Sequence, residues 1–174
     1  MKALFALWLT GLPACGKSAI ARELLVQLHA RGTDPALLES DAMRKQLTPF
    51  PRYDAAERDF FYGCLGDIAV LLVQRGVPVV VDATANKRSY RDGLRARVTN
   101  FAEIFVDTPA EICAARDPKG LYRAAREGSV STLPGSQAAY EPPAAPELIV
   151  PGDGTTPATA AQAVFALLER RGWI

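Results

Sequence analysis

The sequence predicts a three-layer α/β domain, in which helices cover both faces of a mostly parallel five-stranded sheet. Short apolar runs alternate along the chain with segments of helical periodicity, and the strongest runs are apolar on both faces. Hydrophobic residues make up 49% and charged residues 22% of the 174 residues, as is usual for a globular protein. This length suits one core and is too short for two domains of ordinary size. We therefore expect a single domain over residues 1–174.

Five strands are expected, at residues 3–9, 35–39, 77–81, 101–106 and 148–150. The first is a continuous apolar run, which is typical of a parallel strand covered on both faces. The third, Val-Pro-Val-Val-Val, is the strongest strand of the sequence and leads directly into Asp82.

Helices are expected between these strands and after the last one. The first spans about residues 16–30 and ends at Gly32, because glycine readily takes the left-handed conformation that closes a helix. Asp54, followed three residues later by Glu57, predicts the capped start of a long helix that continues to Gly76. Three more helices are expected. One carries Arg88, Arg91 and Arg95, the next runs from Pro109 to about Arg116, and the last begins at Thr156 and Pro157 and continues through Leu168.

Residues 117–146 are rich in glycine, proline, serine and alanine, with a short helix expected at residues 121–126. A segment of this length is long for a passive connection. We expect it to form a lid or a substrate-binding excursion.

The charge balance argues against nucleic-acid or membrane partners. With 20 basic and 19 acidic residues the net charge is +1, which gives no field that would collect nucleic acid or an anionic membrane. Three separated cysteines and one histidine predict neither a zinc site nor a disulfide framework. The apolar start followed by Cys15 also fits a short lipoprotein-type signal peptide, but cleavage there would destroy the loop described next. We expect a cytoplasmic protein.

Residues 11–18, Gly-Leu-Pro-Ala-Cys-Gly-Lys-Ser, match the P-loop pattern G-x-x-x-x-G-K-S between an expected strand and an expected helix. In such loops the backbone N–H groups surround the phosphates, the lysine neutralises the β- and γ-phosphates, and the serine binds Mg²⁺. The pattern predicts a P-loop NTPase fold that binds ATP and Mg²⁺, with Lys17 catalytic and Ser18 at the metal. The nucleotide contacts are expected from Gly11, Ala14, Cys15, Gly16, Lys17, Ser18 and Ala19.

The acceptor is expected beside Asp41 and Arg44, which follow the second strand as D-x-x-R at the carboxyl edge of the sheet. A carboxylate there can orient and deprotonate a hydroxyl group, and an arginine one helical turn later can bind a phosphate or sulfate. The alternative is a helix N-cap followed by a solvated arginine.

Asp82, at the end of the third strand, is a candidate Walker B acid that holds Mg²⁺ or positions the attacking hydroxyl group. The alternative is an aspartate in a turn or at a helix N-cap. Arg88 and Arg91 could reach phosphates, and a solvated helix face explains them equally well.

An aromatic and basic group between the second strand and the long helix could clamp an acceptor that carries a nucleobase. Its members are Tyr53, Arg58 and Phe50, and core packing is an equal alternative for Phe50.

Residues 116–122, Arg-Asp-Pro-Lys-Gly-Leu-Tyr, resemble a motif of the adenylyl-sulfate kinases, which phosphorylate the 3′-hydroxyl group of adenosine 5′-phosphosulfate. The resemblance extends over nearly the whole chain, through the P-loop, residues 105–109 and residues 140–142. It implies that Arg116 stacks on the donor adenine, that Lys119 and the following helix form a mobile lid, and that Asp41 and Arg44 match the family's acceptor-side motif.

The departures from the family pattern fall mostly on the acceptor side. Residues 38–41 read Leu-Glu-Ser-Asp where the family has L-D-G-D, and Phe61 stands where the family has an asparagine three residues after the arginine that matches Arg58. Leu133 removes an aromatic that in the family stacks on the acceptor's adenine. Asp82 stands in a segment where the family has serine.

These features lead to three hypotheses. The first is an adenylyl-sulfate kinase, the second a related P-loop kinase for another nucleotide-linked or phosphorylated hydroxyl compound, and the third a nucleotide-binding regulatory module without catalysis. The expected partner is a small-molecule acceptor, and a homodimer is an oligomeric state that the sequence leaves open.

Overall fold

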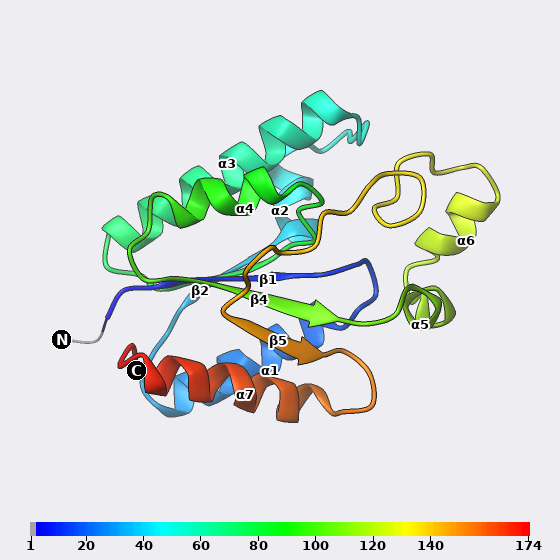
Figure 1. The fold of residues 1–174 in the computed structure, drawn as a ribbon. Helices are drawn as coiled ribbons and strands as arrows, with labels where there is room; N and C mark the ends of the chain where they lie inside the picture. The colour runs from blue at the N-terminus through cyan, green and yellow to red at the C-terminus, as the bar shows by residue number, and fades with distance from the viewer. Residues whose placement is uncertain (1–2) are drawn as a thin grey trace.

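A computed structural model describes residues 3–174 and contains one five-stranded sheet, in the order β2-β3-β1-β4-β5 (Figure 1). Every neighbouring pair of strands is parallel. The strands are β1 (Ala6–Thr10), β2 (Ala36–Glu39), β3 (Val79–Asp82), β4 (Phe101–Asp107) and β5 (Leu148–Pro151). The sequence predicted all five strands, and the sheet is parallel throughout.

Helices cover both faces of the sheet, as a three-layer domain requires (Figure 1). Helices α1 and α7 lie on one face, α3 and α4 lie on the other, and α5 and α6 lie beyond the carboxyl ends of the strands. The helices are α1 (Lys17–Ala30), α2 (Ser40–Leu47), α3 (Ala55–Gln74), α4 (Arg88–Arg95), α5 (Ala110–Arg116), α6 (Leu121–Arg126) and α7 (Pro157–Arg170). None of these helices is long and apolar enough to cross a membrane, as judged over residues 3–174.

The central strand β1 divides the core into two layers. All five of its residues are buried, and alternate side chains face opposite sides of the sheet. Leu7 and Leu9 join the core that includes the buried residues of α1 and α7, whereas Ala6 and Trp8 join the core under α3 and α4. The same alternation in β3 places Asp82 on the α1 side, because Val80 belongs to that core.

The capping residues explain where two helices begin. The Asp54 side chain accepts a hydrogen bond of 2.8 Å from the Glu57 N–H, and Thr156 accepts one of 3.1 Å from the Thr159 N–H. Both starts agree with the sequence prediction. Pro109 lies at the N-cap, one position before the first turn in which it was expected.

Helix α2 was not among the helices expected between the strands, and only the alternative in which Asp41 is an N-cap implied a helix here. It has no buried residue, so the apolar periodicity that reveals the other helices is weak in it. Its N-cap is Glu39, and Asp41 lies in the first turn. The alternative in which Asp41 caps a helix before a solvated arginine is therefore wrong.

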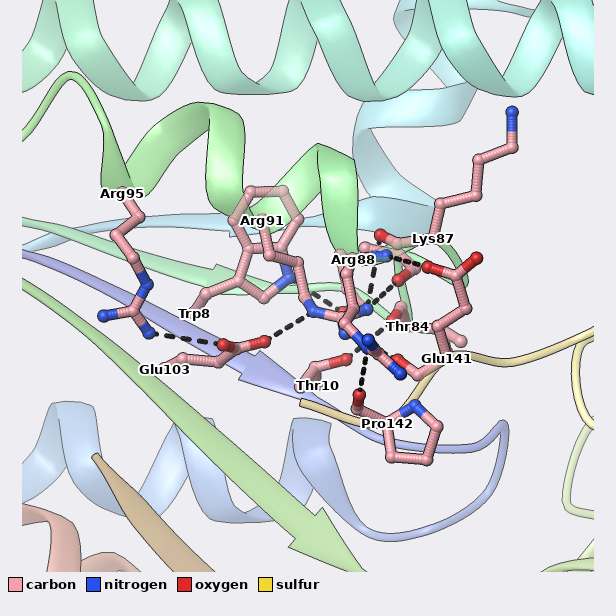
Figure 2. A network of polar contacts seen from close by, with 12 residues as sticks. Trp8, Thr10, Thr84, Lys87, Arg88, Arg91, Arg95, Glu103, Glu141 and Pro142 are labelled. Atoms are coloured by element: carbon pink, nitrogen blue, oxygen red, sulfur yellow. Dashed lines mark hydrogen bonds and ion pairs between the residues drawn. The ribbon is translucent and has the colours of Figure 1, made fainter. Parts of the chain in front are cut away.

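Arg91 forms the centre of a buried polar network between α4, β4 and the segment that returns from residues 117–146 (Figure 2). Its side chain is fully buried, and it donates hydrogen bonds to Glu103 (Nε to Oε1, 2.5 Å), to the Glu141 carbonyl (Nη2, 2.6 Å) and to the Ala85 carbonyl. Neither sequence interpretation of Arg91, a phosphate ligand or a solvated helix face, is correct. The arginine instead ties the returning segment to the sheet.

A candidate nucleotide and acceptor site

The loop at residues 11–16 has the backbone shape that a phosphate-binding loop needs. Gly11 has φ +150°, and a Cβ atom there would lie 2.5 Å from the Val106 carbonyl oxygen and 2.7 Å from the Cys15 Sγ atom. A larger residue would therefore push the loop away from β4. Cys15 is completely buried beneath the loop, in agreement with its expected role as a small filler.

Lys17 lies over this loop, at the start of α1. Its Nζ atom donates to the carbonyl oxygens of Gly11 (3.1 Å) and Leu12 (2.8 Å). The residue before it, Gly16, has no side chain to cap α1, so the first N–H groups of the helix are left for an anion. Charge and backbone donors thus converge where a P-loop binds phosphate.

Asp82 ends β3 beside the strand that leads into the loop, in register with Leu9. The residue is only 3% exposed. Its carboxylate forms no hydrogen bond or ion pair within residues 3–174, and its oxygens keep some contact with solvent. The carboxylate is therefore available to a cation held between Asp82 and the hydroxyl group of Ser18, and these oxygen donors suit Mg²⁺. The alternatives in which Asp82 lies in a turn or caps a helix are wrong, because it lies in the strand and Lys87 is the N-cap of α4.

Arg116 lies beside the loop that follows β5. Its Nη1 atom donates to the Gly152 carbonyl oxygen at 2.6 Å, and it is otherwise exposed. Gly152 itself packs against the P-loop, where the Thr108 hydroxyl group donates to the Cys15 carbonyl oxygen at 2.9 Å. The arginine therefore borders the P-loop side of the site, which is compatible with contact to a bound base.

Residues 117–146, the expected lid, contact both halves of the site. The Tyr122 hydroxyl group donates to the Pro13 carbonyl oxygen of the P-loop at 3.1 Å, and Gly135 packs so tightly on Leu12 that a Cβ atom would overlap it. Lys119 forms an ion pair with Asp41 on α2. The structure thus brings together two of the residues that the sequence assigned separately to the lid and the acceptor site.

Burial raises the pKa of the Tyr122 hydroxyl group, and it raises the pKa of the nearby Cys113 thiol to about 11. Both groups therefore stay protonated at neutral pH. The Tyr122 hydroxyl group can then donate its hydrogen bond to the P-loop over the whole physiological range.

On the acceptor side, Arg44 is enclosed. Its side chain is 11% exposed, and Nη1 donates to Glu57 at 3.0 Å. The guanidinium carbon lies 3.9 Å from the ring centre of Phe61, 5.0 Å from that of Tyr53 and 5.8 Å from that of Tyr62. The sequence placed Arg44 and Tyr53 in one site but did not reveal that Glu57, taken for a capping residue, also holds the arginine.

Arg58 connects three segments around the site. Its Nε atom donates to the Tyr53 carbonyl oxygen at 3.0 Å, Nη1 donates to Asn86 at 3.4 Å, and Nη2 donates to the Thr132 carbonyl oxygen in the lid. Asn86 in turn donates to the Ala139 carbonyl oxygen at 3.1 Å. Arg58 is 9% exposed, so it fixes the base of the lid against α3.

Two of the residues around the proposed acceptor differ in burial from what their proposed roles suggest. Leu133 is 4% exposed and anchors the segment 117–146 in the core. Phe50 is 91% exposed and lines a surface pocket of about 370 Å³ with Thr48, Pro49 and Phe60. Core packing of Phe50 is therefore wrong, whereas Leu133 is packed and not openly presented to a ligand.

A family model described as adenylylsulphate kinase matches residues 3–151. An adenylyl-sulfate kinase from Rippkaea orientalis is 35% identical over 168 residues, which cover 97% of this chain and 93% of the relative. An adenylyl-sulfate kinase from Synechococcus sp. is 38% identical over 142 residues, which cover 82% of this chain and 81% of the relative.

Among solved structures, the APS kinase CysC of Mycobacterium tuberculosis, in complex with AMPPNP and APS, matches with a TM-score of 0.90 and 31% identity. The match covers 97% of this chain and 99% of that one. Sequence and structure thus agree over nearly the full length, and the chain belongs to the adenylyl-sulfate kinase family.

Proposed function

We propose that the protein is an ATP-dependent kinase that phosphorylates the 3′-hydroxyl group of adenosine 5′-phosphosulfate. The observation that carries this proposal is the likeness, over 97% of the chain, to a kinase whose structure holds an ATP analogue and APS. The P-loop, the lid and the pair of Asp41 and Lys119 supply the parts that such a transfer needs.

The donor half of the site binds and polarises the triphosphate. The N–H groups at the start of α1 bind the phosphate oxygens, and Lys17 exchanges its carbonyl partners for the β- and γ-phosphates. Arg116 borders the base, in the role that the family resemblance implies. Ser18 and Asp82 would hold Mg²⁺, which neutralises charge on the phosphates when it is bound.

The acceptor half orients the hydroxyl group. The oxygen of the acceptor's 3′-hydroxyl group attacks the γ-phosphorus atom of ATP, and the bond from that phosphorus to the β–γ bridging oxygen breaks. The hydroxyl proton passes to the Asp41 carboxylate. Arg44 binds the anionic 5′-group, Tyr53 and Arg58 border the acceptor, and Lys119 and Leu133 belong to the lid that closes over it. Closure excludes water, which would otherwise compete as the acceptor.

A second candidate is a related kinase with another phosphorylated hydroxyl compound as acceptor. Two observations favour it: Phe61 is buried against Arg44, and Leu133 is packed in the core, where the family pattern has an asparagine and an aromatic residue. Both changes lie on the acceptor side, so the donor assignment is common to the two candidates.

The proposal is tested by incubating the protein with ATP, Mg²⁺ and adenosine 5′-phosphosulfate and identifying the product by mass and by the position of the new phosphate. We expect 3′-phosphoadenosine 5′-phosphosulfate and one ADP for each molecule formed. ADP release that another acceptor stimulates, with none from the phosphosulfate, would favour the second candidate.

A further inference from the structure

Arg44 rests on a rigid aromatic surface. Its guanidinium carbon lies 3.9 Å from the centre of the Phe61 ring, closer than to any other ring in residues 3–174. Phe61 is completely buried and Tyr62 is 7% exposed, and their rings meet edge to face with centres 5.1 Å apart. The core of α3 therefore fixes the surface on which the guanidinium lies.

This contact holds the arginine without using its hydrogen-bond donors. A guanidinium has five N–H donors, and within residues 3–174 the only side-chain hydrogen bond of Arg44 joins Nη1 to Glu57. A cation–π contact acts through the face of the ring and engages the positive charge. The edge formed by Nε and Nη2 is thus left for an anionic ligand.

Glu57 fixes the same group from another side. Besides the Arg44 guanidinium, its carboxylate accepts hydrogen bonds from the backbone N–H groups of Arg52 and Tyr53. The carboxylate therefore cannot follow the arginine toward a ligand without releasing this segment. Phe61 below and Glu57 at one edge together define a single orientation of the guanidinium.

The held arginine is close in sequence and structure to the proposed catalytic carboxylate. Asp41 and Arg44 are three residues apart on α2, a spacing that places them on one face of the helix. Because the guanidinium is fixed, an anion bound to Arg44 is held at a fixed position relative to Asp41. The acceptor's hydroxyl group can then be placed reproducibly beside that carboxylate.

We infer that Phe61 is a positioning residue that holds Arg44 ready to bind the anionic group of the acceptor. The inference rests on the proposed function, because it takes Arg44 as an acceptor ligand. Phe61 stands where the resembled family has an asparagine, so the acceptor site of this chain uses a ring face in place of a polar side chain. A purely structural role, in which Arg44 only joins α2 to α3, is the competing account.

The test compares the variants Phe61→Leu, Phe61→Tyr and Phe101→Leu by KM for the acceptor, KM for ATP and kcat. Phe61→Leu keeps an apolar side chain but removes the ring face, so we expect acceptor KM to rise about tenfold and KM for ATP to stay within about twofold. Phe61→Tyr keeps the ring face, so we expect its acceptor KM to lie much closer to the wild-type value than that of Phe61→Leu.

Phe101→Leu is the matched control. Phe101 is also buried in the core under α3 and α4, and an arginine, Arg95, lies 4.8 Å from its ring centre. This variant removes an equivalent ring from an equivalent contact away from Arg44. We expect it to lower thermal stability and to leave acceptor KM unchanged.

A double-mutant cycle completes the experiment. In an Arg44→Ala background, Phe61→Leu should add nothing to acceptor KM, because the group that it positions is gone. Additive effects, or an equal change of acceptor KM in Phe101→Leu, would overturn the inference. If the wild-type protein uses another acceptor and not the phosphosulfate, the proposed substrate fails and the same cycle, measured with that acceptor, still decides the role of Phe61.

Discussion

The Nζ atom of Lys119 forms an ion pair with the carboxylate of Asp41, and this pair joins the loop before α6 to the first turn of α2. Both side chains remain more than half exposed. An exposed pair of this kind adds little to stability, about 0 to 1 kcal/mol. The pair is thus free to break when an acceptor hydroxyl group approaches Asp41.

Asp41→Asn should abolish most turnover and leave ATP affinity nearly unchanged. The amide keeps the size of the side chain but cannot take up the hydroxyl proton, and the P-loop contacts of ATP do not include it. Turnover and ATP binding by titration are to be measured on the same preparation. Unchanged turnover would instead make Asp82 the residue that orients the hydroxyl group.

Lys17→Ala should lower phosphoryl transfer by a factor of about a hundred or more, because a preorganised charge at the γ-phosphate is lost. The fold should persist, since the Nζ atom bonds only to its own loop and to Cys15 within residues 3–174. Circular dichroism tests whether the fold persists, and steady-state kinetics measure the loss of phosphoryl transfer. A folded variant with ordinary turnover would remove the basis for placing ATP at residues 11–18.

Asp82→Asn should weaken the response to Mg²⁺ and leave the stability of the metal-free protein nearly unchanged. The carboxylate has no partner within residues 3–174, so its neutral replacement breaks no contact of the metal-free protein and removes only the charge that Mg²⁺ would bind. Thermal unfolding with and without Mg²⁺ and a non-hydrolysable ATP analogue provides a readout that does not depend on turnover. Equal stabilisation by the metal in wild type and variant would exclude Asp82 from the metal site.

Leu133→Phe should lower the free energy of unfolding by about 1 to 3 kcal/mol, because a larger ring would overpack a core position. Leu133 belongs to residues 117–146, is 4% exposed and packs in the core. Denaturant unfolding and acceptor KM are to be measured together. If the variant keeps its stability and acceptor KM falls, Leu133 lines the acceptor's adenine site in the way that the resemblance implies.

The strands and most helices could be predicted because their buried positions are occupied by apolar residues at strand or helix spacing. Residues 79–82 are buried throughout and read Val-Val-Val-Asp, and the Asp54 and Thr156 caps are residue types that favour a helix N-cap. Helix α2 has no buried residue, so the apolar periodicity that would reveal a helix is absent at residues 40–47. Local capping and apolar periodicity therefore predicted the scaffold better than the acceptor side.

The acceptor side depends on contacts between residues that are distant in the sequence. Arg91 pairs with Glu103 on another element, and the carbonyl of Thr132 in the lid accepts from Arg58. No spacing rule predicts such pairs, because the fold brings their elements together. The P-loop pattern could be recognised from the sequence because its residues are eight consecutive ones, 11–18.

The most direct test of the central claim is the rate of Mg²⁺-dependent ADP release with adenosine 5′-phosphosulfate and with its 3′-deoxy analogue. Both compounds present the same base and the same anion to Arg44, and they differ in the atom that Asp41 is proposed to activate. We expect saturable ADP release with the phosphosulfate and no stimulation by the 3′-deoxy compound. Equal rates with both, or no stimulation by either, would contradict the account.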